Sequence, residues 1–411
     1  MNDRAAAKAN LMPANPADKE RFAALHRRFP TIAYLRRHAR RHVPRFAYEY
    51  MDGGAGADTA IAHNWNALDA VELVARYGVS TALPPTEVTL FDRRYAAPLG
   101  IAPMGGPSMA WPGADGYLAR AAQRARVPYT LSTVAGITIE QAAELAPDVL
   151  WFQLYRFARN DHQVGFDLAR RADAAGAHAL VLTLDVPVRT TRPREVHSGI
   201  AYPFRANPRL LWSIATSPGY LMALMRNGRA HFACLRPYVG DKTDVNSMAR
   251  FLRGELRGAF SWEEVARFRE RWKRPLVVKG ILHPGDAEQA VSLGVDGIIV
   301  SNHGGRQVEG LPPAIDALPA VVAAVGKRAT VMMDSGIRSG LDVVRALALG
   351  AEAAFAGKAF LWGLGALGAE GPTHVIDLLI DEMKATLGQI GAHTIAEARR
   401  VKVRHPGALH F

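Results

Sequence analysis

The stretch LVVKGILHPGDAEQAVSLGVDGIIVS, residues 276–301, contains two short apolar runs separated by an amphipathic segment. Each run is almost continuously apolar, which is typical of a strand buried on both faces of a parallel sheet. The segment 284–293 between the runs has the apolar spacing of a helix. The stretch therefore predicts a strand, a helix and a second strand, which is the repeating unit of parallel α/β proteins.

The same unit recurs along the rest of the chain. Eight apolar runs read as buried strands, at residues 98–102, 129–132, 150–153, 179–185, 276–279, 297–301, 330–334 and 353–356. Helical segments between them are clearest at 112–126, 161–175, 284–293, 313–325 and 340–349. Eight strands alternating with helices predict a (β/α)8 TIM barrel. A doubly wound sheet is the alternative, but the glycine cluster at Gly53, Gly54 and Gly56 follows no strand and reads better as a loop.

The chain of 411 residues is long enough for such a barrel with extensions. We expect a basic N-terminal helical arm and lead-in at 1–92, the barrel at 93–370 and a C-terminal helical tail at 371–411. A long insertion after strand four, at 186–272, is expected to be a lid, an oligomer contact or a surface-binding segment. We expect a homo-oligomer, specifically a tetramer.

Composition narrows the class of protein. The single cysteine, Cys234, excludes a disulfide framework, a thiolate zinc site and an iron–sulfur cluster. The N-terminus has no secretory signal, so we expect a cytoplasmic protein, and no metal site is expected. The net charge of +12 is concentrated in residues 1–46 and 186–258, each of which carries a net +8. Such basic segments suit an acidic partner, an anionic membrane or nucleic acid.

Polar side chains stand where the predicted strands end, and barrel active sites are built at the carboxyl ends of strands. The residues expected to meet at this mouth are Ser132, Gln153, Thr183, Asp185, Lys279, Ser301, His303 and Asp334. His303 suits a general base, and Arg306 three residues later suits a planar clamp for a carboxylate. Asp185 can hold and stabilise the protonated ring of His303.

Two further loops predict a phosphate site. Asp334-Ser335-Gly336-Ile337-Arg338 and Ala356-Gly357-Lys358 follow strands seven and eight, where glycine-rich barrel loops commonly bind phosphate. Lys279 on strand five is compatible with a Schiff base or with a cation that stabilises an anionic cofactor ring, and its sequence position does not choose between them.

These motifs resemble those of the FMN-dependent L-2-hydroxy acid oxidases and dehydrogenases. The resemblance runs from about residue 46 to about 368, and its centre is Ser301-Asn302-His303-Gly304-Gly305-Arg306-Gln307. Further motifs agree in order: Tyr48-Glu49-Tyr50, Ile101-Ala102-Pro103, Thr130-Leu131-Ser132-Thr133, Phe152-Gln153-Leu154-Tyr155, Thr183-Leu184-Asp185, Val278-Lys279-Gly280 and Asp334-Ser335-Gly336-Ile337-Arg338.

The resemblance implies a role for each matching residue. The expected FMN ligands are Pro103, Met104, Gly105, Ser132, Gln153, Thr183, Lys279, Ser301, Asp334, Gly336, Arg338, Gly357 and Lys358. In this scheme Lys279 stabilises the reduced anionic flavin, which excludes imine chemistry. Tyr50, Arg192 and Arg306 are expected to bind the substrate carboxylate, with Tyr155 near the hydroxyl. His303 is the expected base, supported by Asp185, as two electrons pass from substrate C2 to flavin N5 by a hydride or a carbanion route.

The chain departs from the family pattern at three places. Val134 replaces a tryptophan of glycolate oxidase, which predicts a wider pocket than a glycolate pocket. Lys358 replaces the usual arginine, which keeps the charge but loses the bidentate fork. The segment 198–258 resembles no member closely, although membrane-bound members dock on lipid through the corresponding region.

Within that segment, the apolar pieces 210–215 and 220–225 are flanked by Arg205, Arg209, Arg226, Arg229 and Arg236. This pattern predicts docking on an anionic membrane, here the cytoplasmic face of the inner membrane, with a lid or a subunit contact as alternatives. The expected reaction is oxidation of a lactate-like or mandelate-like acid, with quinone as electron acceptor and oxygen or a soluble carrier as alternatives. A flavin-dependent isomerase and a non-catalytic basic binding protein are weaker readings, and nucleic acid is not expected as a partner.

Overall fold

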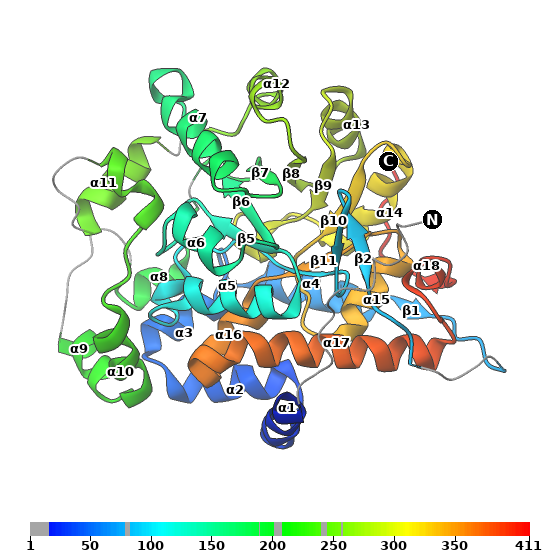
Figure 1. The fold of residues 1–411 in the computed structure, drawn as a ribbon, viewed down its shortest axis with the longest axis horizontal. Helices are drawn as coiled ribbons and strands as arrows, with labels where there is room; N and C mark the ends of the chain where they lie inside the picture. The colour runs from blue at the N-terminus through cyan, green and yellow to red at the C-terminus, as the bar shows by residue number, and fades with distance from the viewer. Residues whose placement is uncertain (1–15, 79–82, 189, 201–207, 240–244, 256–257) are drawn as a thin grey trace, which may run out of the picture.

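The fold of this computed structural model is described for residues 16–78, 83–188, 190–200, 208–239, 245–255 and 258–411. Its centre is a closed parallel barrel in which the strand order is β10-β11-β4-β5-β6-β7-β8-β9 (Figure 1). The strands are β4 (Leu99–Ile101), β5 (Tyr129–Ser132), β6 (Leu150–Leu154), β7 (Leu180–Thr183), β8 (Leu276–Ile281), β9 (Gly297–Val300), β10 (Thr330–Met333) and β11 (Ala354–Ala356). The predicted TIM barrel is confirmed, and all eight predicted strands are present.

Helices surround the barrel and follow the strands in alternation (Figure 1). They are α5 (Ala114–Ala125), α6 (Ile139–Leu145), α7 (Arg159–Ala174), α12 (Trp262–Arg271), α13 (Pro284–Ser292), α14 (Ala314–Val325), α15 (Gly340–Ala348) and α16 (Lys358–Leu367). Two of them begin with a capping box, in which the Thr138 or Ser261 side chain accepts from the third helical amide. These caps satisfy backbone donors that a helix leaves unpaired at its start.

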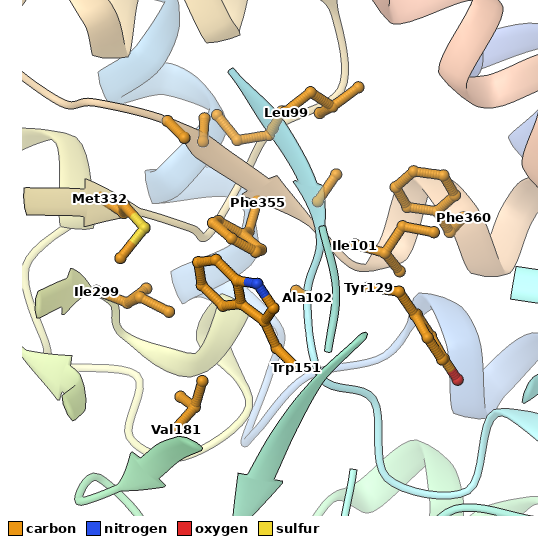
Figure 2. Packing of buried hydrophobic residues seen from close by; sticks show 14 of the residues in the cluster. Leu99, Ile101, Ala102, Tyr129, Trp151, Val181, Ile299, Met332, Phe355 and Phe360 are labelled. Carbon is orange, nitrogen blue, oxygen red and sulfur yellow. The ribbon is translucent and has the colours of Figure 1, made fainter. Parts of the chain in front are cut away.

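The barrel interior is filled by large side chains, one of which packs over a glycine. Trp151 and Phe355 are fully buried in the interior, with ring centroids 5.4 Å apart (Figure 2). Phe355 lies over Gly100, where a Cβ atom would stand 2.3 Å from the Phe355 ring. The indole of Trp151 donates to the Tyr95 hydroxyl at 2.9 Å, so its buried N–H is paired. The barrel is therefore a packed core, and ligands are confined to its mouth.

Additional elements flank the barrel. The N-terminal arm contains α1 (Pro16–Arg28), α2 (Ile32–His42), α3 (Arg45–Asp52) and α4 (Thr59–Asp69). Between β7 and β8 lie α8 (Pro193–His197), α9 (Pro208–Ala215), α10 (Pro218–Asn227) and α11 (Val245–Glu255), and the chain ends with α17 (Gly371–Ile390) and α18 (Ile395–Ala398). Short strands β1 (Glu72–Leu73) and β12 (Val403–Arg404) pair with each other, as do β2 (Val88–Leu90) and β3 (Arg93–Tyr95).

The arm is packed onto the barrel mainly through α16 and α17. Arg36 of α2 forms an ion pair with the buried Asp52 at 2.6 Å and lies against the rings of Trp65 and Trp362. His374 of α17 hydrogen-bonds the carbonyl of Phe29 at 2.9 Å. Among the described helices, none is long and apolar enough to cross a membrane. Arg205, one of the predicted flanking arginines, lies outside the described residues.

Two glycines offer a matched test of this packing. At Gly340, the first residue of α15, a Cβ atom would stand 2.2 Å from the backbone nitrogen of Met383 in α17. At Gly388, inside α17, a Cβ atom would meet nothing within 4 Å. We expect Gly340→Ala to destabilise the protein by about 1–3 kcal/mol through overpacking. Gly388→Ala is expected to stabilise it by about 0.5–1 kcal/mol through helix propensity. Thermal unfolding of both variants measures the difference, and equal melting temperatures would refute the close α15–α17 approach.

Candidate active site

A cavity of about 670 Å³ opens at the carboxyl end of the barrel. Its wall combines the loops after β4, β9, β10 and β11 with residues of α3 and α8, two helices that lie outside the barrel repeat. This volume is in the range of pockets that bind small molecules and cofactors, about 300–1,000 Å³. The strand-end residues predicted a site at the mouth of the barrel, and the structure has a cavity there.

A chain of uncharged hydrogen bonds links residues of β5, β6 and β7. The Ser132 hydroxyl donates to Gln153 Oε1, and Gln153 Nε2 donates to the Thr183 hydroxyl, both at 2.9 Å. All three side chains are buried, so each fixes the orientation of the next. The structure brings together these three predicted residues from β5, β6 and β7 as neighbours.

Lys279 supplies a buried positive charge next to this chain. Its Nζ donates to the Ser301 hydroxyl at 2.6 Å and forms an ion pair with Asp334 at 2.8 Å. Burial opposes protonation of Lys279, but Asp334 and Asp185 outweigh it and raise the pKa of the amine. A Schiff-base lysine must lose its proton to act as a nucleophile. The environment therefore favours the cationic role for Lys279 over imine formation.

His303 lies in the loop after β9 and contacts Asp185 from the loop after β7. Its Nδ1 stands 3.0 and 3.1 Å from the two carboxylate oxygens of Asp185. Burial opposes ionisation of Asp185, but His303 and Lys279 hold the pKa of its carboxyl below the usual value. With Nδ1 engaged in this way, Nε2 is the ring nitrogen that can exchange a proton with a molecule in the cavity, which His303 lines.

The backbone of the His303 loop is held in an unusual conformation. His303 has a φ of +59°, in the left-handed region that side chains other than glycine rarely adopt. Its amide donates to the Ser301 hydroxyl, and the amides of Asn302 and Gly304 both donate to the Ser335 hydroxyl. Hydroxyl groups from the loops after β9 and β10 thus fix a strained loop, a feature that occurs often at functional sites.

Two guanidinium groups also line the cavity. Arg306 donates to the carbonyls of Tyr50 at 3.0 Å and Gly53 at 2.8 Å, and its other terminal nitrogen reaches Glu195 at 2.8 Å. Arg192 reaches the same Glu195 oxygen at 3.2 Å. Burial and the nearby Arg192 lower the pKa of Arg306. The two arginines predicted to bind substrate therefore share one carboxylate oxygen, Oε1 of Glu195.

Two tyrosines also line the cavity. The Tyr50 hydroxyl donates to the Gly105 carbonyl, and the Arg306 guanidinium lies over the Tyr50 ring. Burial raises the pKa of Tyr50 to about 12, so its phenol stays protonated at neutral pH. Burial and the Asp185 carboxylate also raise the pKa of Tyr155. Both phenols can therefore serve as neutral hydrogen-bond donors at the cavity wall.

Glu195 was not predicted from the sequence. It lies on α8, lines the cavity, and accepts from both Arg192 and Arg306 through one oxygen, Oε1. The spacing Arg192-x-x-Glu195 was a usable sign of the first ion pair, because Arg192 caps α8 and Glu195 lies in its first turn. The second ion pair depends on the fold, because Arg306 is more than a hundred residues away.

Three of the residues predicted to bind phosphate line the cavity, and Arg338 does not. Gly336 and Gly357 line the cavity, and Gly357 caps the start of α16. Lys358 also lines it and donates to the carbonyls of Asp52 and Gly53. Burial and Arg306 hold the pKa of Lys358 well below its usual value. Arg338 does not line the cavity, and its guanidinium forms ion pairs with Asp69 and Asp342.

The structure thus gathers most of the predicted set. Those that line the cavity are Tyr50, Pro103, Met104, Gly105, Tyr155, Arg192, Lys279, His303, Arg306, Asp334, Gly336, Gly357 and Lys358. Asp185 and Ser301 contact lining residues, while Ser132, Gln153 and Thr183 form the hydrogen-bonded chain. Within the described part of the chain, no group of three or more histidine, cysteine or acidic side chains is placed to hold a metal ion.

Comparison with known proteins identifies relatives over most of the chain. Residues 39–405 match the family model described as FMN-dependent dehydrogenase. The L-lactate dehydrogenase of Caulobacter sp. (strain K31) is 38% identical over 367 residues, 89% of this chain and 96% of that protein. The L-lactate dehydrogenase of Pseudomonas syringae pv. syringae (strain B728a) is 38% identical over 87% of this chain and 94% of that protein.

Solved structures agree with these sequence matches. The monotopic membrane protein (S)-mandelate dehydrogenase superposes with a TM-score of 0.86 and 31% identity, covering 91% of this chain and 99% of that one. A mandelate oxidase superposes with a TM-score of 0.78 and 34% identity, covering 93% of this chain and all of that one. The resemblance seen in the sequence motifs is confirmed.

The position of Glu195 generates a prediction about anion binding. A ligand carboxylate that approaches Arg192 and Arg306 encounters the negative charge of Glu195 on the same guanidinium groups. Glu195→Gln keeps an oxygen acceptor but removes that repulsion. We expect the variant to bind oxalate more tightly, by about tenfold or less, where tenfold corresponds to about 1.4 kcal/mol. Titration of the holoenzyme by flavin absorbance measures this. Weaker binding in the variant would instead mean that the charge of Glu195 is needed to hold the arginines in place.

Proposed function

Because the chain belongs to the FMN-dependent dehydrogenase family, we propose that it oxidises an L-2-hydroxy acid, lactate-like or mandelate-like, to the 2-oxo acid. One observation carries the proposal. His303, with Nδ1 on the Asp185 carboxylate, lines the same cavity as the two arginines that can bind a carboxylate. A base and a carboxylate clamp in one cavity match the two ends of a 2-hydroxy acid.

FMN is the cofactor of this family, and the cavity suits it. The uncharged chain from Ser132 to Thr183 and the cation of Lys279 offer the mixture of donors that a flavin ring requires. At Gly357 a Cβ atom would occupy space within 4 Å of Met104 and Ala102, so the missing side chain leaves room beside the start of α16. The helix start and Lys358 suit a phosphate at that end. When bound, FMN takes up the two electrons that the substrate releases.

The residues of this chain then position the acid and move one proton. Arg192 and Arg306 hold the carboxylate, and Tyr155 donates to the substrate. His303 accepts a proton at Nε2, either from the hydroxyl in a hydride route or from C2 in a carbanion route. The Asp185 carboxylate stabilises the imidazolium that results, because the opposite charge lies 3.0 Å from Nδ1.

The apolar part of the cavity supports a bulky substrate side chain. Met109, Val134, Ile200, Phe232 and Leu252 line it. Burying each methylene group against such a wall contributes about 0.8 kcal/mol. We therefore expect mandelate-like or longer aliphatic acids to bind more tightly than lactate, in agreement with the wide pocket predicted from Val134.

Membrane docking through α9 and α10 is the second part of the proposal. Leu211, Trp212, Met222 and Met225 project from these helices with 48–72% of their surface exposed. Arg209 and Arg226 on the same helices are also exposed. Exposed apolar side chains with flanking arginines are typical of a segment that lies in the interface of an anionic membrane. The monotopic mandelate dehydrogenase is similar over most of its length, which adds support.

A peripheral position on the membrane favours quinone as the electron acceptor, because quinones are dissolved in the bilayer. Oxygen is the alternative acceptor. Anaerobic reduction of the flavin by substrate, followed by reoxidation with a quinone or with oxygen, discriminates between them. The tetramer expected from the sequence stays a prediction.

The base is tested by His303→Ala. The substitution removes the proton acceptor but leaves the hydrogen-bonded chain and Lys279 in place, so we expect bound FMN to be retained. Anaerobic addition of L-mandelate or L-lactate should bleach the flavin of the wild type. The flavin of the variant should be reduced at least about 10²-fold more slowly, since general base catalysis contributes a rate factor of about 10²–10⁴.

Arg306→Met is the companion variant. It should retain FMN and His303 but need a much higher substrate concentration for half-maximal bleaching, because one guanidinium of the clamp is lost. Bleaching of His303→Ala at the wild-type rate would remove His303 from the mechanism. Absence of bleaching in the wild type with every 2-hydroxy acid would refute the proposed activity itself.

Docking is tested by the triple variant Leu211→Ser/Trp212→Ser/Met225→Ser. We expect the wild-type holoenzyme to sediment with vesicles of mixed neutral and anionic phospholipid, and the variant to lose most of this binding while flavin reduction is unchanged. Equal sedimentation of both proteins would favour a lid or a subunit contact for α9 and α10.

A further inference from the structure

A second groove lies where the end of α1 meets the exposed face of α2, and it shares no lining residue with the cavity described above. Its lining residues are Arg28, Phe29, Tyr34, Arg37, His38, Arg40 and Arg41. The four arginines are exposed, and α2 contains no acidic residue. The groove is therefore a concentrated positive charge that the proposed reaction does not use.

These arginines are not compensated within the protein. Across the described residues, none of the four forms an ion pair, whereas Arg36 on the same helix is paired with Asp52. Arg37 lies three and four positions before Arg40 and Arg41, a spacing at which like charges on a helix repel. Only the last turn of α2, with Arg40 and Arg41, gains from the helix dipole. A bound anion would relieve this repulsion.

Aromatic rings hold two of the guanidinium groups in place. The Arg37 guanidinium lies 4.2 Å from the ring centroid of Tyr34, and that of Arg28 lies 5.3 Å from the ring of Phe29. Stacked in this way, a planar guanidinium loses less freedom when it binds, and its N–H groups match two oxygens of a phosphate. The chemistry of the groove is thus that of a phosphate-bearing ligand.

The helix α2, which forms one side of the groove, packs against α10 through a row of aromatic rings. His42 at the end of α2 stacks on Trp111, with centroids 5.9 Å apart and an interplanar angle of 10°. Trp111 in turn packs edge-on against Tyr220 of α10 at 6.0 Å. Figure 1 shows α1, α2, α9 and α10 together along the lower edge of the molecule. The end of α2 that carries Arg40 and Arg41 therefore packs beside α10, the helix that exposes Met222 and Met225.

We propose that this groove, defined as the α1–α2 groove, binds the phosphodiester headgroup of an anionic phospholipid. The proposal rests on the membrane docking proposed above and adds its second contact. A single weak membrane signal gives marginal binding, and two signals give stable attachment. The groove offers one short cluster with one exposed aromatic ring, Tyr34, beside an apolar surface. A nucleic acid would instead be expected to need a longer basic track with several stacking rings.

The test uses the full-length holoenzyme and the triple variant Arg37→Gln/Arg40→Gln/Arg41→Gln. A matched control, Lys327→Gln/Arg400→Gln/Lys402→Gln, removes three exposed charges from other elements. Sedimentation is measured with vesicles of phosphatidylcholine alone and of phosphatidylcholine with phosphatidylglycerol or cardiolipin. We expect the groove variant to bind anionic vesicles on the order of 10- to 100-fold more weakly, since each cation near a membrane contributes about 1 kcal/mol. The control should change binding by less than about threefold, and both should keep wild-type flavin reduction in solution.

Other outcomes separate the two proposals. If both triple variants lose binding equally, net charge alone acts and the groove proposal is overturned. If inorganic phosphate at millimolar concentration, or a short DNA duplex, binds the groove as strongly as the vesicles do, the lipid assignment is overturned in favour of that ligand. If the wild type binds anionic vesicles and only the α9–α10 variant is impaired, docking stands and the groove proposal fails. If the wild type binds no vesicle, docking fails and the groove proposal fails with it.

Discussion

The buried charge of Lys279 is the interaction on which the arrangement of the site depends. Lys279 stands on β8, its hydroxyl partner Ser301 follows β9, and its carboxylate partner Asp334 follows β10. A lysine with 3% of its surface exposed is strongly destabilising unless its charge is compensated. Because the Ser301 hydroxyl also accepts from the amide of His303, the residue that satisfies the lysine also positions His303, the proposed base. The electrostatics of the barrel and the geometry of the His303 loop are therefore coupled.

A second constraint joins the N-terminal arm to the site. Arg306 and Lys358 donate to backbone carbonyls at the end of α3, and the amide of Ala55 donates to the carbonyl of Gly305. Carbonyls that a helix leaves unpaired at its end are natural partners for such cations. In consequence, the barrel alone does not complete the cavity. Tyr50 reaches it from this arm, whose end is held by Arg306 after β9 and by the Lys358 amine at the start of α16.

The sequence predicted the parts of the molecule that depend on local pattern. Parallel strands are buried on both faces, so runs such as 297–300 are apolar throughout and were found without the structure. The residues after each strand converge by the geometry of a barrel, which made the pairing of His303 with Asp185 predictable. Glu195 and Arg338 depended on contacts between distant segments. Glu195 meets Arg306 from a helix outside the repeat, and Arg338 turns to Asp69 of α4, so neither contact had a signal in its own neighbourhood.

The two basic segments of the chain also have different physical meanings. Each carries a net charge of +8, but in the insertion part of that charge is internal. Arg194 lies among Glu49, Asp52 and Asp58, and Arg192 and Arg306 share Glu195. In the arm, the arginines of the α1–α2 groove have no such partners among the described residues, although Asp52 lies one helix away and is already occupied by Arg36. Charge that the fold compensates serves the site and the packing of the arm. Charge that it leaves uncompensated, in the α1–α2 groove, is available to an anionic partner.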